Sequence, residues 1–197
     1  MDKFIKNFLS EMLSALNDLP KKEIKKAASI LLTAHKNGNR LYVFGNGGSW
    51  AMASHWVSDF NKTIFSTLPA NNKIARFQAI RIPSTHEELT AWANDVGYDM
   101  VFAGPLANHL KKDDVVIAIS SSGSSPNVIN AVKLARDRGA KVIGVSGFDG
   151  GQLNKLADAK LFVSTAKGEY EIVESVHSAI LHLLTRYFRD HFHRLSK

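Results

Sequence analysis

The segment Ser120–Asn127, with the sequence SSSGSSPN, has the residue types of a phosphate-binding loop. It follows a short apolar run and precedes a helical pattern, so it is expected to join a strand to the start of a helix. Backbone N–H groups and the dipole at a helix start attract an anion, Gly123 lets the backbone approach a ligand, and serine hydroxyls can donate further hydrogen bonds. A polar turn in which Ser125 and Pro126 simply start the helix is the alternative.

A second loop, Gly45–Ser49, has the sequence GNGGS, with three glycines in four positions. It also follows an apolar run and precedes a helical pattern. A plain tight turn would explain it alone. Because the two loops follow the first and third predicted strands, we expect them to face one crevice, which is a more specific signal than either loop alone.

The elements that would position these loops alternate between strand and helix. Short apolar runs predict strands at residues 40–44, 77–82, 115–119, 141–145 and 160–163. Helical patterns lie at residues 50–60, 86–94, 101–110, 127–138, 152–156 and 171–188. This order predicts an α/β fold with a doubly wound, five-stranded parallel sheet flanked by helices. In such sheets the ligand binds outside the carboxyl ends of the strands.

The N-terminal part has a different pattern. Residues 2–17 carry apolar side chains at amphipathic helical spacing, and Pro20 separates them from a second helix at about residues 23–36. We therefore expect a helical arm at residues 1–38 and one domain at residues 39–197. The apolar stripe of the arm needs a partner surface, which favours a role in oligomerisation.

The composition limits the class of protein. The 197 residues include no cysteine, so any metal must be held by histidine, carboxylate, amide or water. No stretch approaches the roughly 20 apolar residues of a membrane-spanning helix, and no signal-peptide pattern is visible, so a cytoplasmic location without membrane contact is expected. The net charge is +7, but no nucleic-acid motif accompanies it, so nucleic acid is not an expected partner.

Several segments resemble, in matching order, the motifs of the sugar isomerase (SIS) domain family, and the phosphoheptose isomerase group in particular. These segments are Gly45–Ser49, Asn94-Asp95 followed by Gly97-Tyr98, Ser120–Asn127, Gly147–Gly151, and the late histidines His177 and His182. The resemblance covers roughly residues 1–190. It implies a homotetramer with active sites at subunit interfaces, a divalent metal, usually zinc, and interconversion of sedoheptulose 7-phosphate and an aldose heptose 7-phosphate.

The resemblance also implies roles for individual residues. The implied metal ligands are His55, Asp59, Glu174 and His182. The implied sugar contacts are Asn46, Gly47, Ser49, Asp95 and Glu171. The implied phosphate contacts are Ser120, Ser121, Ser122 and Ser125. Spacing supports part of this set, because His55 and Asp59 are four residues apart and share one helix face.

Two of the implied metal ligands differ from the family pattern, which has Glu where this chain has Asp59 and Gln where it has Glu174. A site of two histidines and two carboxylates still suits zinc or a harder divalent metal. Glu174 and His182 are eight residues apart, which is about 12 Å along a continuous helix, so one ion cannot reach both from one regular helix. Either Glu174 precedes the regular helix or the two residues come from different subunits, and the second reading is favoured.

Aldose–ketose isomerisation needs a base beside the carbonyl and an acid at the sugar oxygens. We assign these catalytic roles to Asp59 and His182. A non-catalytic SIS protein, either a sugar-phosphate binder or a replication-initiator-associating homologue, is the alternative. The remaining histidines, apart from His177, are expected to be structural or on the surface: His35, His86, His109, His191 and His193.

Overall fold

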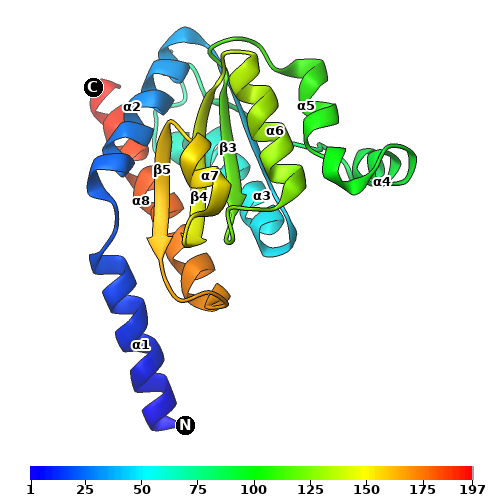
Figure 1. The fold of residues 1–197 in the computed structure, drawn as a ribbon. Coiled ribbons are helices and arrows are strands. Elements are labelled where there is room, and N and C mark those ends of the chain that lie inside the picture. The colour runs from blue at the N-terminus through cyan, green and yellow to red at the C-terminus, as the bar shows by residue number, and fades with distance from the viewer. Residues whose placement is uncertain (197) are drawn as a thin grey trace.

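The computed structural model describes residues 1–196 and has a five-stranded, all-parallel sheet with the order β2-β1-β3-β4-β5 (Figure 1). The strands are β1 (Arg40–Gly45), β2 (Gln78–Arg81), β3 (Val115–Ser120), β4 (Lys141–Phe148) and β5 (Ala159–Ser164). The predicted doubly wound α/β fold is confirmed. The strand order reverses between β1 and β3, so the crevice expected at a topological switch point lies beyond the carboxyl ends of these two strands.

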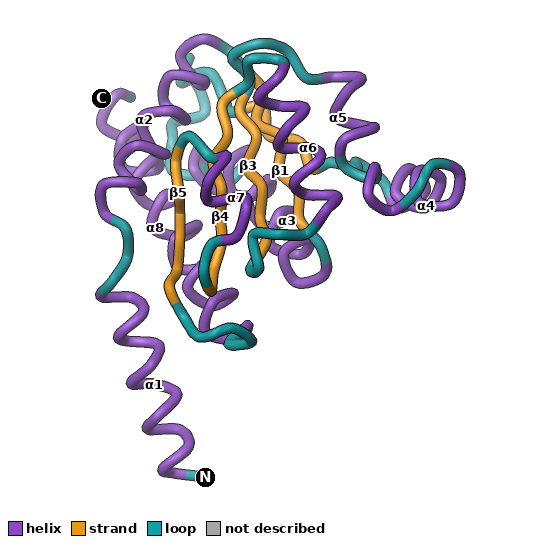
Figure 2. Tube along the Cα trace, viewed as in Figure 1, coloured by secondary structure: helices purple, strands orange, loops and turns teal. Residues whose placement is uncertain are grey.

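The helices form a layer on each side of the sheet (Figure 2). They are α1 (Asp2–Asn17), α2 (Lys21–Asn37), α3 (Gly47–Asn61), α4 (His86–Asp95), α5 (Ala103–His109), α6 (Pro126–Asp137), α7 (Gly151–Leu156) and α8 (Tyr170–Leu195), with short 3₁₀ turns at Thr63–Phe65 and Tyr98–Met100. Successive residues of β3 alternate between the layers: Val115 and Ile117 pack with α2, α3 and α8, whereas Val116 packs with α5, α6 and α7.

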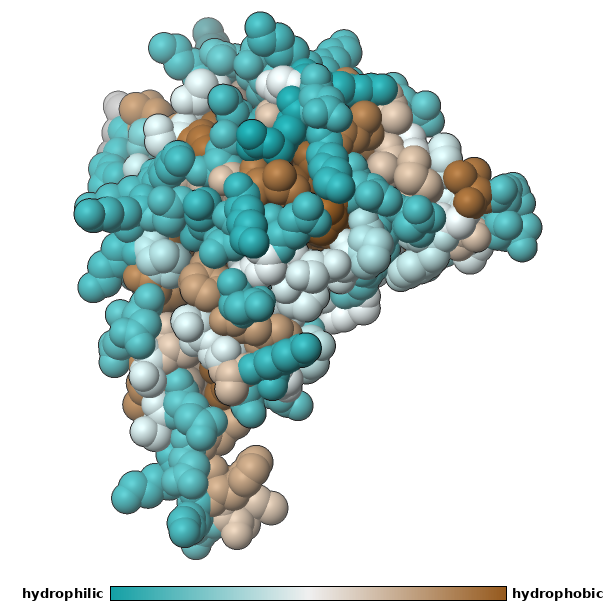
Figure 3. Space-filling view, viewed as in Figure 1, coloured by the Kyte–Doolittle hydropathy of each residue, from teal (hydrophilic) through white to brown (hydrophobic). Residues whose placement is uncertain are grey.

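The two N-terminal helices differ in how they pack. In α1 no residue is buried, and the helix projects from the body of the molecule, with Phe4 70% and Leu13 61% exposed (Figure 1). In α2, apolar side chains such as Ala27 and Leu31 are fully buried in the layer beside the sheet. The face in Figure 3 is mostly hydrophilic, with apolar patches on the body and along the projecting helix. No helix within residues 1–196 is long and apolar enough to cross a membrane.

The last helix is longer than predicted. The apolar spacing places its end near Phe188, but α8 continues to Leu195 as one unbroken helix. The reason is Phe192, one turn after Phe188 and 1% exposed, whose ring lies 5.1 Å from that of Phe65. This packing extends the helix through a polar stretch that would not sustain it alone.

Candidate active site

The two loops singled out in the sequence are joined directly by their side chains. β1 and β3 are neighbouring parallel strands, so the loops that follow them leave the same edge of the sheet. The Nδ2 of Asn46 donates to Oδ1 of Asn127 at 3.0 Å, and the Nδ2 of Asn127 donates to Oδ1 of Asn46 at 2.9 Å. Asn46 is the N-cap residue of α3, and Asn127 lies in the first turn of α6. Two helix N-termini therefore lie beside each other at this edge, where both dipoles favour an anion.

The serine-rich loop is held in a compact shape. Gly123 has a φ of +61°, and its N–H donates to the carbonyl of Ser120 at 2.9 Å. A Cβ on Gly123 would lie 2.1 Å from the carbonyl oxygen of Gly150, so the loop after β4 fits only against a glycine here. The hydroxyl oxygens of Ser120 and Ser125 lie 3.3 Å apart. Ser125 is the N-cap residue of α6 and Pro126 begins the helix, as predicted, but the Ser125 hydroxyl makes no capping bond.

The other implied phosphate and sugar contacts lie in different surroundings. Ser49 is buried in the first turn of α3, and Ser121 is buried in the turn that directly follows β3. Ser122, the next residue in that turn, is half-buried. Gly47, with a φ of +52°, starts α3. Asp95 is exposed at the end of α4 and accepts a hydrogen bond from Asn94 at 2.7 Å.

Glu171 is exposed in the first turn of α8. The segment after Asp95 reaches the crevice through Tyr98, whose hydroxyl donates to Oδ1 of Asn46 at 3.0 Å. We did not predict this contact. The tyrosine follows Gly97 within the Gly97-Tyr98 motif, which was the only signal for it.

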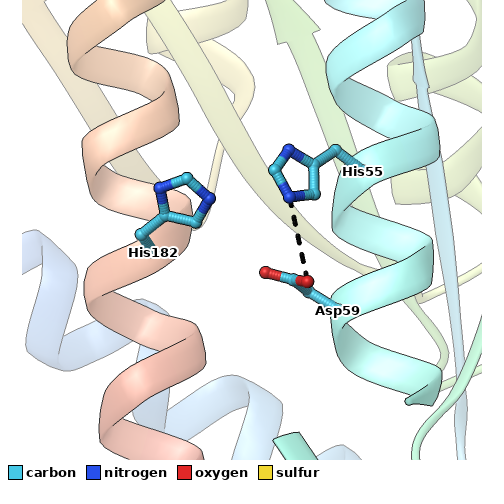
Figure 4. Close-up of side chains that lie close together, drawn as sticks. All are labelled: His55, Asp59 and His182. Atoms are coloured by element: carbon cyan, nitrogen blue, oxygen red, sulfur yellow. Dashed lines mark ion pairs between the residues drawn. The ribbon is translucent and has the colours of Figure 1, made fainter. Parts of the chain in front are cut away.

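Three of the four implied metal ligands meet between α3 and α8 (Figure 4). One ligand atom from each of His55, Asp59 and His182 lies within 4.8 Å of the others. The Nε2 of His55 is 3.8 Å from Oδ1 of Asp59, beyond hydrogen-bond distance, and the rings of His55 and His182 are 5.0 Å apart. Asp59 is buried, whereas both histidines are exposed at the mouth of the cluster.

The donor set of this triad fits a divalent metal. Zinc binds histidine nitrogen and carboxylate oxygen at about 2.0–2.2 Å, so two ligand atoms on one ion lie up to roughly 4 Å apart. The spacing of 3.8 Å between His55 and Asp59 is within that limit, and His182 needs only a small side-chain movement. Two imidazoles and one carboxylate, with the histidines open to solvent, leave room for a further ligand.

The fourth implied ligand, Glu174, lies elsewhere in the same chain. A Cβ placed on Gly48 would be 2.6 Å from Oε2 of Glu174, so this carboxylate lies against the first turn of α3. The dipole of α3 favours a negative charge there, which gives a physical reason for Glu where the family has Gln. Because α8 is continuous from Tyr170, the reading in which Glu174 precedes the regular helix is wrong.

Asp59 has a partner that the sequence pattern did not identify. The hydroxyl of Thr185 on α8 donates to Oδ2 of Asp59 at 3.0 Å, and both side chains are buried. The spacing of three residues between His182 and Thr185 would have placed the hydroxyl on the same face of the helix. Only the packing of α8 on α3 shows what that face meets.

His177 does not belong to the cluster. It is fully buried beneath β4, where its Nε2 lies 3.0 Å from the carbonyl oxygen of Ser146. Burial lowers the pKa of His177 to about 4, because the charged imidazolium would lose its hydration, and the hydrogen bond to Ser146 opposes this only in part. At neutral pH it is therefore an uncharged core residue, with Nε2 as the donor.

The parallel sheet, the paired loops at its switch point and the cluster between α3 and α8 define an α/β domain whose crevice suits an anionic ligand and whose His–Asp–His cluster suits a divalent metal. Residues 4–147 match the family model described as the SIS domain. The chain belongs to this family, among the phosphoheptose isomerases.

Individual relatives support this placement. The phosphoheptose isomerase of Aliarcobacter butzleri is 40% identical over 164 residues, covering 81% of this chain and 82% of the relative. The corresponding protein of Citrifermentans bemidjiense is 35% identical over 176 residues, covering 88% and 86%. Among solved structures, the phosphoheptose isomerase of Neisseria gonorrhoeae superposes with a TM-score of 0.84 at 26% identity, covering 96% of this chain and 98% of that chain.

Proposed function

We propose that this protein is an aldose–ketose isomerase that interconverts sedoheptulose 7-phosphate and D-glycero-D-manno-heptose 7-phosphate. The observation that carries the proposal is the clustering of a buried carboxylate, Asp59, with the histidines His55 and His182, in a chain that also keeps the paired crevice loops. The family relation supplies the substrate, since the similar curated proteins are named phosphoheptose isomerases.

The chain's own residues divide the task. The loop Ser120–Ser125 and the N-terminus of α6 would bind the phosphate, and Asn46 and Ser49 would contact the sugar. Asp59 would take the proton from the carbon beside the carbonyl and return it to the neighbouring carbon. His182 would donate to and accept from the sugar oxygens during this transfer. Burial of Asp59 keeps bulk water away from the carboxylate.

The metal expected at this site is zinc, held by His55, Asp59 and His182. When bound, it would supply Lewis-acid polarisation of the carbonyl and of the enediolate. We further propose that Glu174 of a second copy completes the ligand set. This proposal is supported by the continuous α8, along which Glu174 lies about 12 Å from His182 in the same chain. It agrees with the expected homotetramer and with the exposed apolar stripe of α1, which would need a partner.

The test is to incubate the purified protein with sedoheptulose 7-phosphate, with and without zinc, and to follow aldose formation. Asp59→Asn should abolish turnover while sugar-phosphate binding stays measurable, since the phosphate loops are separate from the triad. Asp190→Asn, the same change at an exposed position of α8, serves as the control. No turnover in either condition, together with no metal by elemental analysis, would refute the isomerase assignment. Full activity of Asp59→Asn would refute the role of the base.

The second candidate, a non-catalytic sugar-phosphate binder, is favoured by the two changed ligand positions, Asp59 and Glu174, where the family pattern has Glu and Gln. The hydrogen bonds that shape the crevice loops join Asn46, Asn127 and Tyr98 and do not involve the triad. A protein that binds sugar phosphate but never forms aldose in the same assay would support this candidate.

A further inference from the structure

The strongest unassigned feature is the contact between Thr185 and Asp59, and it concerns the geometry of the triad. Thr185 lies on α8 and Asp59 lies on α3, 126 residues apart in the chain. A threonine inside a helix can bond the carbonyl one turn earlier, but this hydroxyl donates instead to Oδ2 of Asp59 at 3.0 Å. Both side chains are nearly inaccessible, at 5% and 6% exposed, so water does not compete for this bond.

The two oxygens of the Asp59 carboxylate have different neighbours. Oδ2 of Asp59 is occupied by the Thr185 hydroxyl, while Oδ1 is the oxygen that faces Nε2 of His55 at 3.8 Å. A carboxylate can rotate broadly about its last side-chain torsion, so without a fixed partner either oxygen could face the histidines. The Thr185 hydroxyl removes this freedom.

We propose that Thr185 is a positioning residue that locks the carboxylate of Asp59, so that Oδ1 faces Nε2 of His55. α8 then contributes two groups to the cluster, a ligand at His182 and the lock one turn later. The short side chain of Asp59 depends on such a lock, because its carboxylate stays close to α3 and must be aimed from the facing helix. The predicted effect of Thr185 on turnover rests on the proposed function, whereas its predicted effect on metal binding does not.

The test compares Thr185→Val, which keeps the shape but loses the hydroxyl, with Thr185→Ser, which keeps the hydroxyl. Zinc and cobalt affinity are measured by competition with a chelator, and the cobalt protein is examined by its visible absorption spectrum. Loss of a hydrogen bond that orients a metal ligand reduces metal affinity by roughly 10- to 100-fold, so Thr185→Val should show a loss of this size and an altered cobalt spectrum. Thr185→Ser should keep both properties.

Two further variants make the comparison specific. Thr33→Val, the same change at an exposed position of α2, controls for the general effect of the substitution. Asp59→Ala should weaken metal binding by itself, and adding Thr185→Val to it should cause no further loss, because the hydroxyl would act only through Asp59. Thermal melting of the metal-free proteins checks that each variant folds.

Metal affinity and the cobalt spectrum are measured without substrate, so the positioning role of Thr185 is tested independently of the isomerase assignment. If the protein does turn over sugar phosphate, Thr185→Val should lower kcat and leave KM unchanged, because the phosphate loops lie apart from the triad. Wild-type metal affinity in Thr185→Val, an equal loss in Thr185→Ser, or a full additional loss in the Asp59→Ala background would each overturn the proposal. Failure of the wild-type protein to bind zinc or cobalt would do the same.

Discussion

The buried His177 predicts a specific loss of stability in mild acid. In the folded protein its pKa is lowered from 6.5 to about 4 by burial, whereas in the unfolded chain it is that of an ordinary histidine. As the pH falls below 6.5, the unfolded state takes up a proton that the folded state refuses until about pH 4. The contribution of neutral His177 to the free energy of unfolding is therefore complete above pH 6.5 and is lost progressively between pH 6.5 and 4.

The magnitude follows from the same values. A difference of about 2.5 in pKa, at about 1.36 kcal/mol for each pKa unit, corresponds to about 3 kcal/mol lost by pH 4. His177→Gln should remove this pH dependence, since glutamine can keep a donor toward the carbonyl of Ser146 but does not titrate. The variant can be less stable at pH 7, because the side chains differ in shape, so the quantity to compare is the change with pH.

The assay is urea unfolding of metal-free protein at several pH values between 7 and 4, for the wild type, His177→Gln and the exposed control His109→Gln. The free energy of unfolding should fall with decreasing pH by about 3 kcal/mol less in His177→Gln than in the wild type. His109→Gln should follow the wild type. Parallel curves for the wild type and His177→Gln would refute the argument that this histidine is kept neutral by burial.

Three further outcomes are expected. Gly123→Ala should raise KM for the sugar phosphate, because the added Cβ would lie 2.1 Å from a backbone carbonyl oxygen and displace the loop. Gly38→Ala is the control: it has a similar positive φ but no atom within 4 Å, so it should cost only about 1 kcal/mol of stability and leave KM unchanged. An unchanged KM in Gly123→Ala would argue against the loop as the phosphate site. Gly48→Ala should displace the Glu174 carboxylate and so lower kcat. The melting temperature should change little, because the end of the Glu174 side chain is flexible and can move. Wild-type kcat in this variant would show that the position of the Glu174 carboxylate does not matter. Chelation should abolish turnover and zinc should restore it, and activity that survives complete metal removal would contradict the role given to the triad.

Much of the fold could be predicted because each strand carries its own local signal. The β3 run of residues 115–119 is buried on both faces of the sheet, so its unbroken apolar character shows directly in the sequence. The paired loops were also predictable, since parallel strands send their carboxyl ends to one edge. Ser125 and Pro126 begin α6 as their capping preferences indicate.

The contacts that could not be predicted are those between elements distant in sequence. Thr185 is an unremarkable helix residue until α8 packs on α3 and brings its hydroxyl to Asp59. Phe192 extends α8 beyond the predicted end because its ring meets Phe65 and the ring of His35, at 5.1 and 4.5 Å. His35, expected to be structural, lies in this aromatic cluster. Local periodicity carries no information about such partners.

Helix α3 connects the crevice and the triad as one rigid element, since Asn46 precedes its first turn and Asp59 lies near its end. From Ser49 to Asp59 it advances about 15 Å, and each residue turns it by about 100°. An insertion or deletion of one residue before His55 would therefore swing the histidine and carboxylate away from α8 while leaving the crevice loop unchanged. The spacing along α3 therefore acts as a phase constraint: the number of residues between Ser49 and His55 must be kept for the crevice and the triad to keep their relative orientation.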